Sequence, residues 1–275
     1  MRKPLRTISS AALLATLALA PLAADAGGSV NVLILKENGS GSASAAQGYV
    51  DRLMGHVASE NGWDSATGKY LTSRSMAKSW ISSNNPHFGI MSLPAYLALR
   101  SQHNLEVVGQ AQVRGGGGKQ YFVVSSSQGS LADCKGKVLG TDHGDDARFI
   151  DNVVGKREFS LSDFTMQDTR RPMATVKAVA RGDVDCALID DAQKSKLGSV
   201  DGGDAVRVVW SSAELPPMAV VAFGSAPSGE KKTFKSKLAA VCSGGGAEAC
   251  KEVGLRSLSS GSDADYASVV KDYGG

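Results

Sequence analysis

Short apolar runs alternate with amphipathic stretches along most of this chain, which is the pattern of an α/β protein. A β-branched and apolar run at 30–35 predicts a strand, and apolar positions at helical spacing over 45–61 predict a helix. The alternation continues to the C-terminus. Further strands are expected at 68–72, 88–91, 105–114, 120–125, 138–139, 160–166, 184–191, 206–210 and 218–223. Further helices are expected at 74–82, 92–99, 170–181, 231–241 and 265–273.

One stretch, 130–149, combines a short buried strand with a polar loop. Val138 and Leu139 form the apolar core of the strand, and the loop at 141–146 follows before helical spacing resumes. In open α/β sheets, ligands bind outside the carboxyl ends of the strands. We therefore expect this loop to form one wall of a ligand cleft. Its candidate ligand-binding residues are Asp142, His143, Asp145 and Asp146.

Other predicted strand ends also carry polar side chains. Ser40 lies in a Gly/Ser-rich loop, which is equally consistent with an exposed turn because no phosphate-loop continuation follows. Ser92 is predicted to cap a helix. Tyr96 follows one turn later, where packing on the helix face is the alternative to stacking on a ligand. Asp190 ends a buried strand and completes the set of candidate ligand-binding residues.

A run of four glycines at 115–118 separates two predicted strands. Glycine leaves the backbone free to turn, so this run is a candidate crossing between two lobes, and a second strand pair offers the return crossing. We expect one lobe to contain 27–114 and 218–275, and the other to contain 115–217.

The N-terminus has the pattern of a secretory signal peptide at 1–26. Basic residues precede an apolar run at 11–22, and Ala-Asp-Ala at 24–26 matches a cleavage site. The alternative is a buried N-terminal helix. The run is short for a membrane span, and no second long apolar run follows. We expect a soluble periplasmic protein that is not embedded in the membrane.

Charge and cysteine content refine this picture. The leader holds three basic residues and one acidic residue, which leaves 27 basic and 26 acidic residues in the mature chain. Such a balance gives no electrostatic basis for binding nucleic acid or an acidic membrane surface.

Four cysteines in an exported chain predict disulfides, with three pairings open. Cys242 and Cys250 flank a glycine run and can close a small loop, which leaves Cys134 with Cys186. Four reduced, buried cysteines are the alternative.

Several motifs occur in an order that carries a family resemblance. They are F-G-I-M-S-L-P-A-Y-L (88–97), Tyr121 before an apolar strand, S-L-A-D-C-K-G-K-V (130–138), A-V-A-R-G-D-V-D (178–185) and W-S-S-A-E-L-P-P-M (210–218). The chain resembles the periplasmic solute-binding proteins of type II fold, nearest the phosphonate/phosphite-binding (PhnD-like) family of ABC transporters. The resemblance implies two α/β lobes joined by two crossing segments, a small-molecule ligand captured between them by hinge closure, and a transporter permease as partner. We expect the protein to be a monomer.

The sequence departs from the family pattern at the anion pocket. The family binds its anion at a hydroxyl-rich S-T-S-G turn on a helix N-terminus, and the matching turn here is 145–148, which reads D-D-A-R. The family's histidine on a later helix corresponds to Pro172. Two carboxylates repel a dianion, so a cationic or neutral polar ligand is expected in place of a phosphonate. Alternatively, Asp145 and Asp146 only cap the helix. A metal bound by His143 and these aspartates is a weaker alternative because no supporting spacing is present.

Enzymatic motifs are missing from the sequence. It contains no nucleophile elbow, zinc-protease helix, complete phosphate-binding loop or dinucleotide fingerprint, and no cofactor is expected. Two alternatives to the transport role stay open. One is a periplasmic sensor that docks on a receptor kinase, and the less favoured one is an exported enzyme on the same scaffold.

Overall fold

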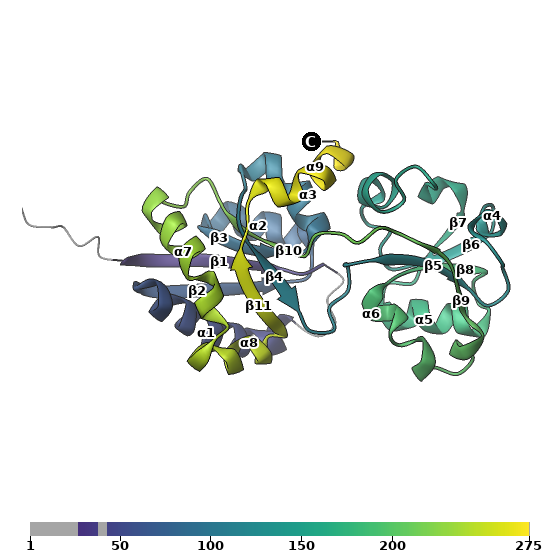
Figure 1. The fold of residues 1–275 in the computed structure, drawn as a ribbon, viewed down its shortest axis with the longest axis horizontal. Coiled ribbons are helices and arrows are strands. Elements are labelled where there is room, and N and C mark those ends of the chain that lie inside the picture. The colour runs from purple at the N-terminus through teal and green to yellow at the C-terminus, as the bar shows by residue number, and fades with distance from the viewer. Residues whose placement is uncertain (1–26, 38–42, 275) are drawn as a thin grey trace, which may run out of the picture.

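The computed structural model describes residues 27–37 and 43–274, which form two α/β lobes lying side by side (Figure 1). Each lobe is built around one β-sheet. We call the part around the six-stranded sheet the large lobe and the part around the five-stranded sheet the small lobe. The two sheets agree with the α/β architecture that the sequence predicts.

The large-lobe sheet is mixed and has the strand order β11-β4-β10-β3-β1-β2. Its strands are β1 (Gly27–Leu35), β2 (Trp63–Leu71), β3 (Phe88–Met91), β4 (Glu106–Val113), β10 (Met218–Ala222) and β11 (Leu255–Ser260). β1 pairs in parallel with both β2 and β3, whereas β10 is antiparallel to β3 and β4. The carboxyl ends of β1 and β3 therefore lie together at one edge of the sheet.

Helices cover both faces of this sheet (Figure 1). They are α1 (Ala43–Asn61), α2 (Arg74–Asn84), α3 (Leu93–His103), α7 (Ser228–Val241), α8 (Ala247–Glu252) and α9 (Ala267–Tyr273). In α1, the buried residues Val50, Leu53, Met54 and Val57 recur at helical spacing and pack with α7 against one face. Residues of α2, α3 and α9 join the apolar cluster on the other face.

The small-lobe sheet has the strand order β7-β6-β8-β5-β9. Its strands are β5 (Tyr121–Ser125), β6 (Val138–Thr141), β7 (Thr165–Asp168), β8 (Cys186–Asp190) and β9 (Arg207–Ser211). Its helices are α4 (Leu131–Cys134), α5 (Pro172–Arg181), α6 (Asp191–Lys194) and a π-helical segment, Phe149–Val154. β6 and β8 are parallel, so the residues that follow them share one edge of the sheet.

Two segments connect the lobes, one between β4 and β5 and one between β9 and β10 (Figure 1). They are hydrogen-bonded to each other, because the N–H of Leu215 donates to the carbonyl of Lys119 at 2.8 Å. The C-terminal helix α9 makes a third contact. The Arg148 guanidinium of the small lobe donates to the carbonyl of Gly274 at 2.7 Å. One buried apolar cluster accordingly continues from α3 and α9 into the small lobe.

Most predicted elements are present, and the differences have local causes. Helix α5 begins at Pro172 and ends at Arg181. Gly182 caps it with a φ of 74°, the left-handed conformation that favours glycine. The strand predicted at 160–166 is wrong in its first half. Ser160 and Asp163 form a capping box around a 3₁₀ turn, and the strand begins only at Thr165.

Two elements of the large lobe were not predicted. Strand β11 reads L-R-S-L-S-S, and only Leu255 and Leu258 are buried in it. It is an edge strand paired with β4 alone, so it needs few apolar positions. Helix α8 is too short for a clear periodic pattern.

The structure contains two disulfides, each within one lobe. Cys134 on α4 is bonded to Cys186 on β8, and Cys242 at the end of α7 is bonded to Cys250 on α8. These are the two pairs that the sequence favoured. Within the described ranges, no helix is long and apolar enough to cross a membrane.

Candidate ligand site between the lobes

Three predicted ligand-binding residues lie together at the carboxyl edge of the small-lobe sheet. Asp142 and His143 directly follow β6, and Asp190 ends the parallel strand β8. Nε2 of His143 is 4.0 Å from Oδ1 of Asp142 and 4.0 Å from Oδ2 of Asp190. All three residues are buried. The topology thus brings together side chains that are 48 positions apart in the sequence.

Gln193, which the sequence analysis did not select, joins these three residues. Its Oε1 accepts a hydrogen bond from the N–H of Asp190 at 2.9 Å, and its Nε2 donates to Oδ1 of Asp142 at 2.8 Å and to the carbonyl of Pro172 at 3.1 Å. These partners fix the orientation of the amide. Nε2 of His143, 2.7 Å from Oε1 of Gln193, must therefore be the donor in that contact.

The capping box at the start of α6 is the sequence signal that would have found Gln193. Asp190 is the N-cap, and its carboxylate accepts from the N–H of Gln193 at 2.9 Å. Gln193 returns the bond from the third helical position, as the D-x-x-Q spacing predicts. A local helix start therefore orients part of the candidate site.

Asp142 has one satisfied and one unsatisfied oxygen. Oδ1 accepts from Thr175 Oγ1 at 2.8 Å and from Gln193. Oδ2 is buried and has no hydrogen-bond partner in the part of the chain that the structure describes. Leaving a buried acceptor unpaired costs about 1–3 kcal/mol, and more for a charged group. A donor group on a ligand would remove this cost.

Tyr121 and Asp190 have perturbed titration behaviour. The Tyr121 ring meets His143 edge-on at 5.2 Å, and burial, with the charge of Asp190, raises the pKa of this tyrosine well above its ordinary value. Tyr121 is therefore a neutral phenol at physiological pH. Burial also raises the pKa of Asp190, while His143 acts in the opposite direction. The small-lobe wall thus presents carboxylates in a region of low dielectric constant.

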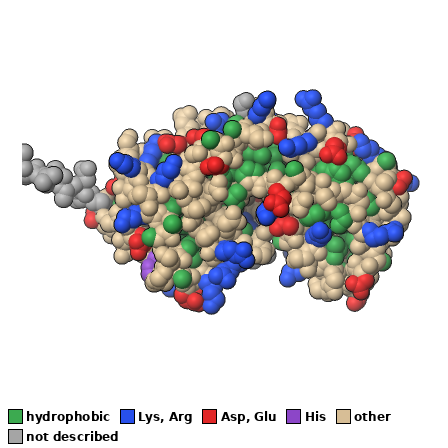
Figure 2. Space-filling view, in the orientation of Figure 1, with side chains coloured by type: hydrophobic (Ala, Val, Ile, Leu, Met, Phe, Trp, Pro, Cys, Tyr) green, Lys and Arg blue, Asp and Glu red, His purple; other side chains and the backbone are tan. Residues whose placement is uncertain are grey.

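The large lobe contributes Lys36, the first residue after β1. Its half-buried side chain lies near the glycine run, because a Cβ on Gly116 would be 3.4 Å from its Nζ. A Cβ on the next residue, Gly117, would overlap the Asp190 carboxylate. The glycines thus allow side chains of both lobes to approach the crossing segment closely. Acidic and basic side chains also lie next to each other in the middle of the face shown in Figure 2.

Ser92 and Tyr96 have different environments. Ser92 follows β3 as the N-cap of α3, and its Oγ is buried without a hydrogen-bond partner among the residues described. The Tyr96 ring is fully buried and packs edge-on against Tyr266 at 5.4 Å. Tyr96 is a core residue of the large lobe, which is the alternative that the sequence left open. Ser40 lies outside the described residues.

Asp145 and Asp146 also differ from each other. Asp145 is exposed. Asp146 Oδ1 accepts from the N–H of Phe149 at 3.0 Å, and Oδ2 accepts from Arg74 Nη1 at 2.8 Å and from the Tyr273 hydroxyl at 3.1 Å. Asp146 is thus a cap, as one alternative proposed, and it also contacts the large lobe.

Arg74 carries the ionic part of that interlobe contact. The first residue of α2, it binds Glu37 through two hydrogen bonds, of 2.6 and 2.8 Å, in addition to Asp146. One guanidinium therefore pairs with a carboxylate from each lobe. Asp146 has a cationic partner within the protein, whereas Asp142 and Asp190 have no arginine or lysine within 4.0 Å among the described residues.

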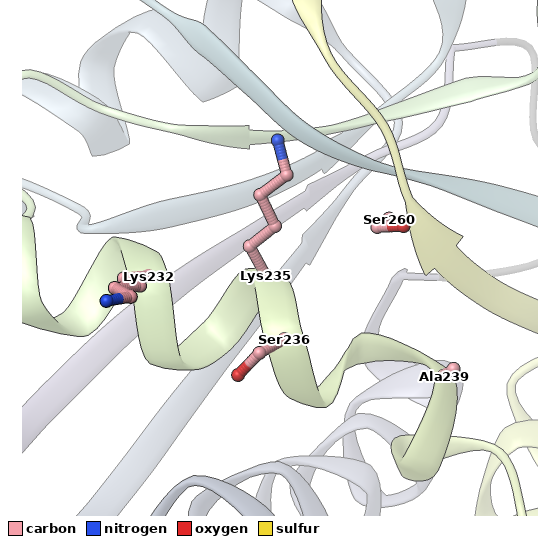
Figure 3. Close-up of a pocket in the computed structure, with 5 residues that line it drawn as sticks. All are labelled: Lys232, Lys235, Ser236, Ala239 and Ser260. Atoms are coloured by element: carbon pink, nitrogen blue, oxygen red, sulfur yellow. The ribbon is translucent and has the colours of Figure 1, made fainter.

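Other candidate sites would be a metal centre or a pocket outside the predicted site. Among the described residues, no group of three or more His, Cys, Asp and Glu side chains could hold a metal ion. A surface depression of about 320 Å³ lies on the large lobe between α7 and β11 (Figure 3). It is lined by Lys232, Lys235, Ser236, Ala239 and Ser260, all exposed and none of them in the predicted site.

The two lobes and the polar cluster between them define a two-lobed solute-binding protein of the type II periplasmic class. The family model for the periplasmic substrate-binding protein of phosphonate ABC transporters matches residues 51–266. The chain belongs to this family. No curated protein sequence matches it.

Solved structures show the same fold at low sequence identity. A binding-protein component of an ABC phosphonate transporter from Pseudomonas aeruginosa is 12% identical, with a TM-score of 0.64 over 90% of this chain and 85% of that one. PhnD1 from Prochlorococcus marinus, in complex with methylphosphonate, is 11% identical, with a TM-score of 0.64 over 89% and 96%. The aliphatic sulphonate-binding protein SsuA from Escherichia coli is 12% identical, with a TM-score of 0.56 over 90% and 84%.

Proposed function

We propose that this protein captures a small polar solute between its lobes and delivers it to the permease of an ABC-type uptake system. Removal of 1–26 on export would leave a soluble, monomeric periplasmic protein. The moving bodies would be 27–114 with 218–275, and 115–217. Family membership and the separate sheets support this proposal. The hinge would lie in the two hydrogen-bonded crossing segments.

The observation that supports the assignment of the site is the buried Oδ2 of Asp142, which has no hydrogen-bond partner among the residues that the structure describes. The same carboxylate is held by Thr175 and Gln193 through its other oxygen, so its orientation is fixed before any ligand binds. A fixed acceptor at the strand edge that faces the other lobe is suited to a ligand N–H or O–H group. Asp190 and His143 would complete this wall.

The charge of the wall indicates which solutes fit. Two unit charges of like sign 4 Å apart repel by about 4 kcal/mol at an effective dielectric constant of 20. Asp142 and Asp190 would each oppose a phosphonate or phosphate dianion at that range. We therefore propose that the ligand carries a cationic or neutral donor group toward the small lobe. We assign this role to Asp142 and Asp190 and not to Asp146, whose carboxylate is paired with Arg74.

A thermal-shift screen followed by small-angle scattering tests this function. Amines, amino acids, polyols and phosphonates would be screened for an increase in melting temperature, and the best solute would then be added during scattering. We expect a rise in melting temperature together with a smaller radius of gyration. A protein that no small solute stabilises, and whose radius of gyration stays constant, would contradict the proposal.

A further inference from the structure

Lys36 is a half-buried lysine whose ammonium group has no partner among the described residues. Within 27–37 and 43–274, no ion pair or hydrogen bond to its Nζ is present. Burial lowers the pKa of this lysine, and the charge of Asp190 acts in the opposite direction. Partly desolvating an ammonium is costly unless it is paired. The position of Lys36 therefore calls for an anionic partner from outside the described chain.

Ser92 lies beside Lys36 because of the sheet topology. Leu35 and Met91 are directly paired in the parallel strands β1 and β3, so Lys36 and Ser92 are the residues that follow the two paired ends. The N–H of Ser92 donates to the carbonyl of Leu35 at 2.9 Å. The buried Oγ of Ser92 has no hydrogen-bond partner in the described part of the chain. It lies at the N-terminus of an eleven-residue helix, where the helix dipole favours negative charge.

The large-lobe wall therefore offers donors, whereas the small-lobe wall offers the acceptors of Asp142 and Asp190. Lys36 and Asp190 approach two consecutive residues, Gly116 and Gly117, whose Cα atoms are about 3.8 Å apart in any trans peptide. Their charged groups are nevertheless more than 4.0 Å from each other, since they form no ion pair. The two walls are thus close enough for one short molecule to touch both.

We propose that Lys36 and Ser92 form a subsite for a singly charged anionic group, such as a carboxylate, while Asp142 and Asp190 bind a protonated amine at the other end of the same ligand. The ligand class is then a short zwitterion. This inference rests on the proposed function, because it assigns the two ends of a ligand held between the lobes. The negative group would pair with the buried ammonium, and the ammonium of the ligand would satisfy Oδ2 of Asp142.

Calorimetry with a matched four-carbon set tests the two subsites separately. The probes are 4-aminobutyrate, butylamine and butyrate, which share a chain and differ in their charged ends. We expect 4-aminobutyrate to bind at least tenfold more tightly than either singly charged probe. Glycine, 3-aminopropionate and 5-aminopentanoate would then measure the separation of the subsites, since one length should bind best.

Two variants assign the anionic end. Lys36→Met should weaken the binding of 4-aminobutyrate at least tenfold and leave the affinity for butylamine unchanged or slightly higher. Ser92→Ala should weaken the binding of 4-aminobutyrate about three- to tenfold. Lys69→Met is the control, because Lys69 is exposed on the neighbouring strand β2. Its affinities should match those of the wild type, and circular dichroism would verify that all three variants fold.

Four outcomes would overturn the inference. If the wild type bound butylamine and 4-aminobutyrate equally well, the subsite for an anionic group would be contradicted. The same conclusion would follow if Lys36→Met lost equal affinity for both probes. Binding of another solute, with closure but no response to any member of the four-carbon or chain-length sets, would also overturn it while leaving the proposed function intact. If no solute binds or closes the lobes, both proposals fail.

Discussion

The two walls of the candidate site are built alike but differ in how far the protein satisfies its own polar groups. Both consist of residues that follow parallel strands. On the small-lobe wall, Gln193 and Thr175 hold the polar side chains, and Oδ2 of Asp142 is a buried acceptor without a hydrogen-bond partner among the described residues. On the large-lobe wall, Lys36 and the Ser92 hydroxyl have no partner among the described residues. The first wall is organised before binding, whereas the second depends on the ligand.

This difference separates stability from affinity. Changes to the small-lobe network should reduce both, because the network contributes to folding and also orients the acceptors. Changes to the large-lobe wall should reduce affinity and leave stability almost unchanged. The following predictions test that contrast in order of expected effect.

The largest effect is expected from the Cys134–Cys186 disulfide. It anchors β8, which ends at Asp190, and it closes a loop between residues 52 positions apart. Loop-closure entropy predicts that Cys134→Ala with Cys186→Ala lowers the free energy of unfolding by about 4 kcal/mol. Ligand affinity should fall as well, because the wall loses its support. Urea denaturation and calorimetry measure the two quantities.

The second disulfide is the matched comparison. Cys242–Cys250 closes a loop of only 8 positions in the large lobe and touches neither wall. Its removal should cost about 2–3 kcal/mol and leave the affinity unchanged. Equal losses of affinity in the two double variants would contradict the claim that β8 supports the small-lobe wall.

The next effect is expected at Gln193. Gln193→Ala leaves Asp142, His143 and the N–H of Asp190 without this amide, and each is buried. We expect a loss of about 2–4 kcal/mol in the free energy of unfolding. Ser92→Ala should be neutral or slightly stabilising, because it removes a buried hydroxyl that has no described partner. Denaturation midpoints compare the stability of the two variants. An equal loss of stability in both would contradict the proposed difference between the two walls.

A smaller effect concerns pH. The pKa of Asp190 is raised in the folded state, chiefly by burial, so the folded protein binds this proton more tightly than the unfolded chain does. This group therefore destabilises the fold at neutral pH, and the destabilisation is relieved as pH falls toward about 4, the ordinary pKa of aspartate. Asp190→Asn keeps an oxygen that can cap α6 and should lose this pH-dependent destabilisation. Melting temperatures of the wild type and the variant, from neutral to acidic pH, measure the difference. Identical pH profiles for the two proteins would contradict the prediction.

The smallest effect is expected at the interlobe ion pair. Asp146→Asn keeps an oxygen that can cap the π-helical segment and removes the charge facing Arg74. Partly exposed ion pairs contribute about 1 kcal/mol or less. We expect a slightly larger radius of gyration without ligand and about fivefold weaker binding. Asp145→Asn is the control because Asp145 is exposed, and the same change in both variants would assign the effect to general charge.

Apolar periodicity, capping residues and glycines predicted the α/β elements because they act locally, and the two-lobed fold was implied by the family resemblance. The helix expected at 170–181 is α5, which Pro172 and Gly182 delimit. The sequence also placed Asp142, His143 and Asp190 at strand ends, which the topology then brings together. It could not assign Lys36, because a lysine after a strand is normally exposed, whereas here the Nζ lies beside the glycine run of a crossing segment. Likewise, the Arg74–Asp146 pair joins residues 72 positions apart and has no local pattern.

Calorimetric titration of the wild type and Asp142→Asn with butylamine and methylphosphonate tests the central claim, that the small-lobe wall selects a cationic group. The substitution preserves shape and removes the charge on a carboxylate whose Oδ2 has no hydrogen-bond partner among the described residues. We predict that the wild type binds butylamine in preference to methylphosphonate and that Asp142→Asn weakens butylamine at least tenfold. Micromolar binding of methylphosphonate by the wild type, with butylamine unaffected by the substitution, would contradict the account.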